Sequence, residues 1–168
     1  TKDSAGYYFG KAQSILRSKA DTANYLYYKF YHFQAEQLND SAYFYSEQVI
    51  PYLEELDSLE RLRKVYERLH FIELRSGQYE QAIEYTNKAI SVAERLRDTA
   101  MISLHLADKS IVYHDFEDYE RGVEFGKKAY RTMEMASNKE YRYLIYANNA
   151  IGINFDDWGK ADSALYYH

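Results

Sequence analysis

The residues of this chain that could carry chemistry are few and lie far apart. Glu67 and His70 have the three-residue spacing of the helical carboxylate–histidine pairs in di-iron sites, but such a site needs two pairs and two more carboxylates. Only one Glu-x-x-His pair is present, so we expect it to be solvated or to face a groove. The chain has no cysteine, which excludes thiol nucleophiles, disulfide bonds and thiolate metal sites. A metal-dependent helical enzyme is therefore the third of three functional hypotheses.

The acidic run from Asp115 to Glu120, DFEDYE, lacks the glycine and the distal glutamate of a calcium-binding loop. Its position after an apolar-periodic stretch indicates a polar turn followed by a helix N-terminus. The sequence contains no HExxH motif, no GxSxG motif and no glycine-rich phosphate loop. We therefore expect no catalytic residue, no cofactor and no metal, and we expect that the protein is not an enzyme.

The composition narrows the class of partner. The 168 residues include 21 Lys and Arg against 26 Asp and Glu, a net charge of −5, without a basic run, which argues against direct nucleic-acid binding. No apolar run is long enough to span a bilayer, and the first residues lack the basic-then-apolar order of a signal peptide. The absence of cysteine fits the bacterial cytoplasm and periplasm equally, so the compartment stays open. The 20 tyrosines supply large apolar surfaces that keep a polar tip in water.

Four amphipathic stretches of three to four helical turns recur along the chain, each with apolar residues at three- and four-residue steps. They span residues 24–38, 62–77, 102–116 and 143–159, and glycines end two of them. Small residues that open second helices recur at spacings of 37, 40, 40 and 42, namely Ala5, Ala42, Ala82, Gly122 and Ala164. The unit is therefore a helix, a tight turn and a second helix, repeated about every 40 residues.

The segments SGQYEQAIEYTNKAI (76–90) and IGINFDDWGKADSAL (151–165) resemble the tetratricopeptide repeat. Ile151, Gly152 and Phe155 match its Leu-Gly pair and following aromatic residue, while Ala82 and Ala89 match the small residues of its second helix. The resemblance covers essentially the whole chain. The period is longer than the usual ~34 residues, as in sensory regions of bacterial signalling proteins, and Lys109 stands where a core leucine is expected.

This resemblance implies an all-α fold, a right-handed α-α superhelix (solenoid) of antiparallel helix pairs. We predict one domain over residues 1–168, with these parts: the second helix of a truncated repeat (1–19), repeats 1 to 3 (20–57, 58–97 and 98–137) and a truncated fourth repeat (138–168). Both ends fall inside a repeat, so we expect the chain to be a segment of a longer array. Uncapped ends expose apolar faces and favour self-association.

Two positions test this register. Ala or Gly at a helix crossing lets two backbones approach, so Ala82→Trp should overpack the crossing and destabilise the fold by ~1–3 kcal/mol or more. Pro51 cannot donate a hydrogen bond to the carbonyl of Glu47, and we predict a kink or a helix end there.

An Asp-Ser/Thr-Ala tripeptide recurs five times, each time at a predicted helix start. The tripeptides begin at Asp3, Asp21, Asp40, Asp98 and Asp162. We interpret them as helix caps, because Asp and Ser oxygens accept hydrogen bonds from the free amides of a first turn. They also resemble the O-glycosylation signal of some exported bacterial proteins. Measuring the intact mass of the natively produced protein would decide between capping and glycosylation.

In tetratricopeptide arrays the first helix of each pair lines a concave binding surface. The resemblance implies that aromatic, then basic, then acidic side chains line it here. These residues are Asn24, Tyr27, Tyr31, Gln34, Lys64, Glu67, Arg68, Phe71, Arg75, Asp108, Ile111, His114, Asn149, Ile153 and Asp156. Tyr and Arg are frequent binding anchors, although aromatic stripes at helical spacing are also ordinary packing. Tyr27 and Tyr31 occupy the places of the Lys and Asn that clamp a peptide carboxylate in some members.

We therefore expect a non-catalytic scaffold that binds a protein or peptide partner. Tyr31→Ala and Arg68→Ala should weaken binding and leave the fold intact. The alternative is a ligand- or partner-sensing region of a larger bacterial two-component or transcriptional regulator, in which binding shifts an output equilibrium.

Overall fold

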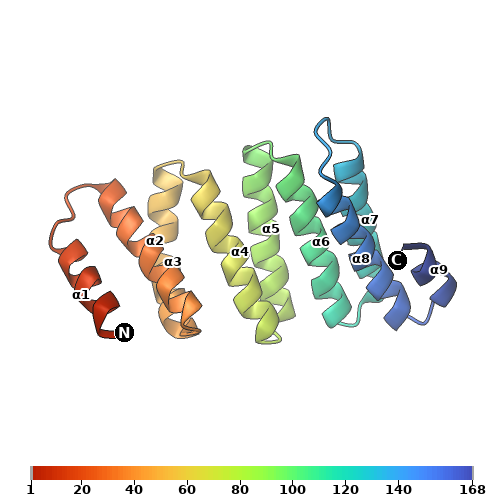
Figure 1. Ribbon diagram of the computed structural model, residues 1–168, viewed down its shortest axis with the longest axis horizontal. Helices are drawn as coiled ribbons and strands as arrows, with labels where there is room; N and C mark the ends of the chain where they lie inside the picture. Colours follow the sequence, from red (N-terminus) through yellow and green to blue (C-terminus); the bar gives the residue numbers. More distant parts are fainter. Residues whose placement is uncertain (1, 168) are drawn as a thin grey trace. The chain divides into compact units, whose positions relative to one another are not determined.

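The chain folds into α-helices joined by short turns, as the helical period of its apolar residues predicts (Figure 1). The computed structural model describes residues 2–167, with side chains from residue 5 onward, and within this part the chain forms nine helices and no strand. The predicted segments 1–19 and 138–168 include positions that lie outside the described residues. These are Thr1, His168 and the side chains of Asp3 and Ser4. The helices are α1 (Lys2–Gln13), α2 (Lys19–Ala35), α3 (Asn39–Glu55), α4 (Leu59–Arg75), α5 (Tyr79–Arg95), α6 (Thr99–Asp115), α7 (Tyr119–Glu134), α8 (Tyr141–Asp157) and α9 (Ala161–Tyr167).

The helices form two compact units, Thr1–Val65 and Tyr66–His168, with the boundary inside α4. In the first unit α2 and α3 pack antiparallel across a three-residue turn. Helical spacing places Leu26 and Phe30 on the same side of α2, and both are buried with Val49 and Leu53 of α3. The division into four repeats stays a prediction.

In the second unit α6, α7 and α8 pack against one another, and α9 packs against α8. Small side chains fill the contacts among α6, α7 and α8, where Ala107, Ala129 and Ala147 are fully buried. Ile151 and Phe155 continue the core toward α9 and pack with Ala164. None of the described helices is both long and apolar enough to cross a bilayer.

Six turns share one geometry, in which three residues separate two helices and the middle residue has a positive φ. Gly77 (φ 71°) and Gly159 (φ 75°) take this conformation without a Cβ penalty, as their predicted role at helix breaks requires. In each turn the next residue's amide donates to the carbonyl five residues earlier, for example Gln78 to Glu73 at 2.9 Å, which closes the helix end. The other four middle residues are Gln37, Asp57, Arg97 and Glu117.

Of the kink or helix end predicted at Pro51, the helix end is wrong, because α3 continues to Glu55. The kink stays a prediction. Pro51 lies in the last turn and its lost hydrogen bond concerns only the carbonyl of Glu47, an exposed residue that water can reach.

The Asp-Ser/Thr-Ala tripeptides cap fewer helices than predicted. Asp98 is an N-cap and accepts from the amide of Met101 at 3.0 Å. At α2 the cap is Ser18, and Asp21 completes a capping box by accepting from its amide. Asp40 and Asp162 lie within the first turns of α3 and α9, because these helices begin earlier than the tripeptides predict. Glycosylation of the tripeptides stays a prediction.

Four of the five small residues of the predicted register are buried, whereas Ala5 is half-buried. Ala42, Ala82 and Ala164 are buried, as is Gly122. An added Cβ on Gly122 would lie 1.8 Å from Oδ1 of Asn154 in α8. The backbone of α7 can therefore approach α8 only because residue 122 has no side chain.

Candidate binding surface

Three predicted surface residues of α2 meet one residue that the sequence did not single out. Helical spacing places Asn24, Tyr27 and Tyr31 on one side of α2, and the two tyrosine rings lie 4.7 Å apart. The guanidinium of Arg61, at the start of α4, lies 5.2 Å from the ring of Tyr27 and donates a hydrogen bond to Oδ1 of Asn24. We call these four residues the α2 tyrosine cluster.

The α2 tyrosine cluster is half-buried, so its rings are held in place while part of their surface meets solvent. Burial, together with a hydrogen bond to Tyr31, raises the pKa of Tyr27, so its hydroxyl stays neutral at physiological pH. The positive charge of the cluster is therefore that of Arg61. Two other predicted residues of this unit are not brought into the cluster: Gln34 lies at the end of α2, and Lys64 pairs with Glu60 at 3.5 Å.

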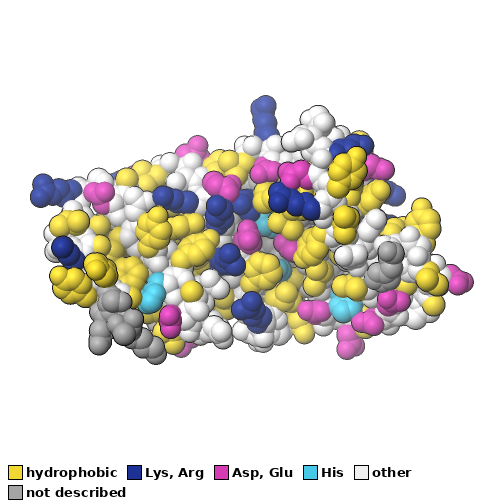
Figure 2. Space-filling model, viewed as in Figure 1, with side chains coloured by type: hydrophobic (Ala, Val, Ile, Leu, Met, Phe, Trp, Pro, Cys, Tyr) yellow, Lys and Arg dark blue, Asp and Glu magenta, His cyan; other side chains and the backbone are white. Residues whose placement is uncertain are grey.

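In the second unit, the predicted residues of α4 share one side of the helix at three- and four-residue steps. Glu67, Arg68 and Phe71 are half-buried and Arg75 is exposed. Basic side chains gather over α4 in Figure 2. The basic stretch of binding surface that the sequence predicts stays a prediction.

The expectation that Glu67 and His70 form a solvated or groove-facing pair is wrong for His70, which is 2% exposed. Its Nδ1 lies 2.8 Å from Oγ1 of Thr86 and 3.3 Å from the carbonyl of Ala82. Since the Thr86 hydroxyl itself donates to Ala82, the contacts are satisfied when Nδ1 carries the proton and donates. Burial lowers the pKa of His70, which favours the neutral ring. Within the described residues, no group of three or more His, Cys, Asp or Glu could hold a metal ion.

The prediction that Asp108 lines the binding surface is also wrong, because Asp108 is buried. Its carboxylate lies 3.2 Å from Nδ1 of His105 and accepts a hydrogen bond from the hydroxyl of Tyr146 in α8 at 2.9 Å. Burial, with the charge of Asp108, raises the pKa of Tyr146 and keeps that hydroxyl a donor. Asp108 therefore joins α6 to α8 and is not available to a partner.

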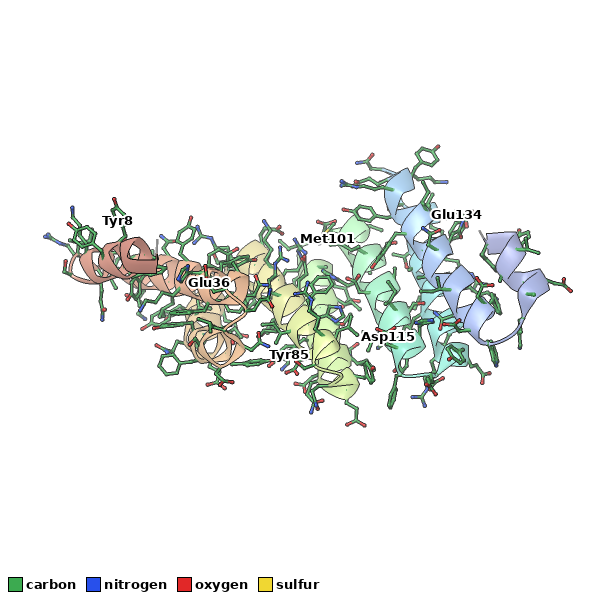
Figure 3. All side chains as sticks on the ribbon, turned by 60° about the horizontal axis from the view of Figure 1, so that its bottom comes forward. Tyr8, Glu36, Tyr85, Met101, Asp115 and Glu134 are labelled. Carbon is green, nitrogen blue, oxygen red and sulfur yellow. The ribbon has the colours of Figure 1, made fainter. Side chains whose placement is uncertain are left out.

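The remaining predicted residues lie at the surface of α6 and α8. Ile111, His114 and Ile153 are half-buried, whereas Asn149 and Asp156 are exposed. Acidic side chains gather over the ends of α6 and α8 (Figure 2). Asp115 ends α6 at the turn into α7 (Figure 3), where Asp118 caps the next helix, as the acidic run predicted.

His114 connects α6 to α8 through two carboxylates. Its Nε2 lies 2.7 Å from Asp157 and its Nδ1 lies 2.9 Å from Asp115. Burial is the largest single influence and favours the neutral ring, but the hydrogen bonds and charges of the two carboxylates together outweigh it and raise the pKa of His114. The protonated ring then donates from both nitrogens.

This raised pKa predicts a pH-dependent contribution to stability. The contribution is fully present below the ordinary histidine pKa of about 6.5 and is lost as the pH rises through the higher pKa of the folded state. The difference in melting temperature between the wild type and His114→Gln should therefore be largest near pH 6 and shrink toward pH 8.5. Asp157→Asn should show the same trend. A difference that is constant or grows with pH would rule out this linkage.

Comparisons with known proteins identify the fold. No family model matches the sequence, and no curated protein matches it. Aspartyl phosphate phosphatase F from Bacillus subtilis has a similar structure, with 22% identity and a TM-score of 0.81 over 98% of this chain and 44% of that one. The apo form of RapI is 14% identical, with a TM-score of 0.80 over 92% of this chain and 42% of that one. A Rap protein complexed with competence and sporulation factor is 14% identical, with a TM-score of 0.70 over 90% and 42%.

The chain spans less than half of the length of these three proteins. At these identities the likeness concerns the fold. The predicted fold class, an all-α solenoid of tetratricopeptide-like helix pairs, is confirmed. The assignment to a long-period tetratricopeptide type stays a prediction.

Proposed function

We propose that this chain is a non-catalytic module that binds a protein or peptide partner. The α2 tyrosine cluster carries the proposal. It combines tyrosine and arginine, the side chains most often found as binding anchors, and fixes them by contacts between α2 and α4. Anchors held in place before binding lose little conformational entropy when a partner arrives.

The fold supports this role. Repeated helix pairs present side chains from successive first helices on one continuous side of each pair, which suits extended partners. One protein with a similar structure was solved in complex with competence and sporulation factor. Selection from a random peptide library would identify a partner of the present chain.

A random peptide library displayed on phage tests the proposal, with the folded chain immobilised as bait. The strongest selected peptide should bind Tyr31→Ala and Arg61→Ala about tenfold or more weakly than the wild type, because each substitution removes an anchor. Tyr8→Ala is the control, since Tyr8 is 66% exposed on α1 (Figure 3) and is not a member of the α2 tyrosine cluster. Arg68→Ala tests whether the same peptide also contacts α4 of the second unit.

Binding would be measured by fluorescence anisotropy, and circular dichroism would verify that each variant keeps its helical content. If the peptide binds both cluster variants as tightly as it binds the wild type, the assigned surface is wrong. If no peptide is selected at all, the proposed function itself fails.

A second candidate is the sensing region of a larger bacterial regulator. The observation that favours it is length: this chain matches less than half of each of the three proteins with a similar structure. In this case the same peptide contact would shift the equilibrium of an output region. A full-length version that contains an output domain, and whose activity changes on peptide binding, would support this candidate.

A further inference from the structure

Lys29 occupies an aromatic box in the first unit. Its ammonium nitrogen lies 5.5 Å from the ring centre of Phe9, 5.0 Å from that of Tyr25 and 4.7 Å from that of Tyr45. It donates a hydrogen bond to the Tyr45 hydroxyl at 2.9 Å. The three rings come from α1, α2 and α3, so the box joins the three helices.

Two hollows meet at this box. The larger has a volume of about 880 Å³ and is lined by α2, α3 and the end of α1. The smaller has a volume of about 730 Å³ and is lined by α1 and the second half of α2. Both hollows are lined by Gln13, Tyr25 and Lys29. The two hollows therefore adjoin at these residues, where the Tyr25 hydroxyl donates a hydrogen bond to Oε1 of Gln13 at 3.2 Å, and together we call them the Lys29 groove.

Aromatic and aliphatic side chains supply apolar surface on the walls of the Lys29 groove. Phe33 stacks on Tyr45 with a ring separation of 5.2 Å and an interplanar angle of 3°. Phe44, which is 58% exposed, and Leu38, which is 49% exposed, add apolar surface to the two hollows. Apolar side chains of a bound segment would thus find contacts on both sides of Lys29.

The Lys29 groove and the α2 tyrosine cluster lie on opposite sides of α2. Successive residues of a helix are turned by about 100°, which places Tyr25 and Lys29 roughly opposite Tyr27 and Tyr31. A ligand in the groove would not cover the cluster. The groove is therefore a separate surface from that of the proposed function.

The charge of Lys29 lacks a carboxylate partner among the described residues. Burial opposes the charge of Lys29, but the nearby hydroxyls of Tyr25 and Tyr45 favour it more strongly and raise the pKa of Lys29. The ammonium group is therefore charged at neutral pH. One of its three N–H donors is used by the Tyr45 hydroxyl, which leaves two for a ligand. By contrast, Lys19 in the same groove pairs with Glu55. Glu36 and Glu47 also line the hollows but are exposed and do not pair with Lys29.

We infer that the Lys29 groove binds a peptide segment with one carboxylate side chain between apolar residues, the carboxylate pairing with Lys29. A carboxylate would accept a hydrogen bond from one of the remaining N–H groups and neutralise a half-buried cation. Each hollow alone has the size of a small-molecule pocket. Because they adjoin at Lys29, a ligand with apolar groups in both hollows would be a longer one, an extended peptide segment. This inference goes beyond the proposed function and does not depend on it.

An array of acetyl-Ser-Φ-Glu-Φ-Ser-amide peptides, in which each Φ is Leu, Phe or Tyr, tests the inference. A matched array carries Gln in place of Glu. The best Glu peptides should bind about tenfold more tightly than their Gln counterparts, since only the carboxylate forms a charge-assisted hydrogen bond. Lys29→Met should reduce the binding of Glu peptides to the level of the Gln peptides.

Lys109→Met is the matched control. Lys109 lies 80 residues after Lys29, two repeat lengths along the chain, and its ammonium also lies over a ring, 4.1 Å from the centre of Phe125. It donates to the amide oxygen of Asn87 at 2.8 Å and belongs to the second unit, so it does not line the Lys29 groove. This variant should bind the Glu peptides as the wild type does. Tyr31→Ala should also bind them normally, which separates this inference from the proposed function.

A second measurement uses only the wild-type chain, in case Lys29→Met fails to fold. The side-chain ¹³C resonances of Lys29 should move when a Glu peptide is added, because the ring contacts of the ammonium change. The inference is overturned if Glu and Gln peptides bind equally, if no Glu peptide binds at about 1 mM, if folded Lys29→Met binds like the wild type, or if the Lys29 resonances stay in place on binding.

Discussion

Replacing Gly122 with alanine is expected to lower the free energy of unfolding by about 1–3 kcal/mol, because the new methyl group has no room. Its Cβ would lie 1.8 Å from Oδ1 and 2.4 Å from Cγ of Asn154. Asn154 cannot turn away easily, since it is fully buried and its amide nitrogen donates to the carbonyl of Ala150 at 2.7 Å. Ser110, whose hydroxyl donates to the Gly122 carbonyl at 2.6 Å, holds the same contact from α6.

Urea unfolding followed by circular dichroism measures this effect. Gly10→Ala is the control, because nothing lies within 4 Å of its added Cβ, and alanine in an exposed helix should stabilise by about 0.5–1 kcal/mol. In the double variant Gly122→Ala/Asn154→Ala the clash is gone, so the two substitutions should cost less together than the sum of their separate costs. If Gly122→Ala is as stable as the wild type, the close approach of α7 and α8 is incorrect.

Ala82→Trp is expected to destabilise the chain by about 3 kcal/mol or more, through overpacking of a buried helix contact. Ala82 is fully buried, and its carbonyl accepts a hydrogen bond from Thr86 and lies 3.3 Å from Nδ1 of His70. An indole at this position must displace α4 or α5 and would disturb the hydrogen bonds of His70. Gln81→Trp, one residue earlier and exposed, should leave the melting temperature nearly unchanged. A melting temperature of Ala82→Trp equal to that of Gln81→Trp would contradict the repeat register.

The helices and their small contact residues could be predicted from the sequence because both follow from periodicity. Ala42, Ala82 and Gly122 recur at a nearly constant spacing, and a helix pair that packs closely needs a small side chain at that place. The turn conformations could be predicted only at the glycines. Arg97 and Glu117 take the same left-handed conformation without that signal, because the closing hydrogen bonds of the turn impose it.

The candidate surface could be predicted only in part. Asn24, Tyr27 and Tyr31 share one side of α2 by helical spacing alone, which the sequence shows. Arg61 was missed because its contact with Asn24 depends on the register between two helices. The only signal is that Arg61 follows Asn24 by 37 residues, close to one repeat length.

For His70 and Asp108 the sequence predicts surface positions, but the structure buries both residues. A polar side chain at helical spacing resembles a surface residue when only its own helix is considered. Here Thr86 on α5 and Tyr146 on α8 supply the hydrogen bonds that make burial tolerable. Partners on other helices decide the position of such residues, and one sequence does not show them.

The central claim is that the α2 tyrosine cluster is the contact surface for a protein or peptide partner. The most direct measurement is an NMR titration of the chain, with ¹³C-labelled tyrosine rings, by the strongest phage-selected peptide. We predict that the ring resonances of Tyr27 and Tyr31 shift in proportion to the bound fraction while those of Tyr8 stay in place. Binding that leaves the Tyr27 and Tyr31 resonances unchanged would contradict the claim.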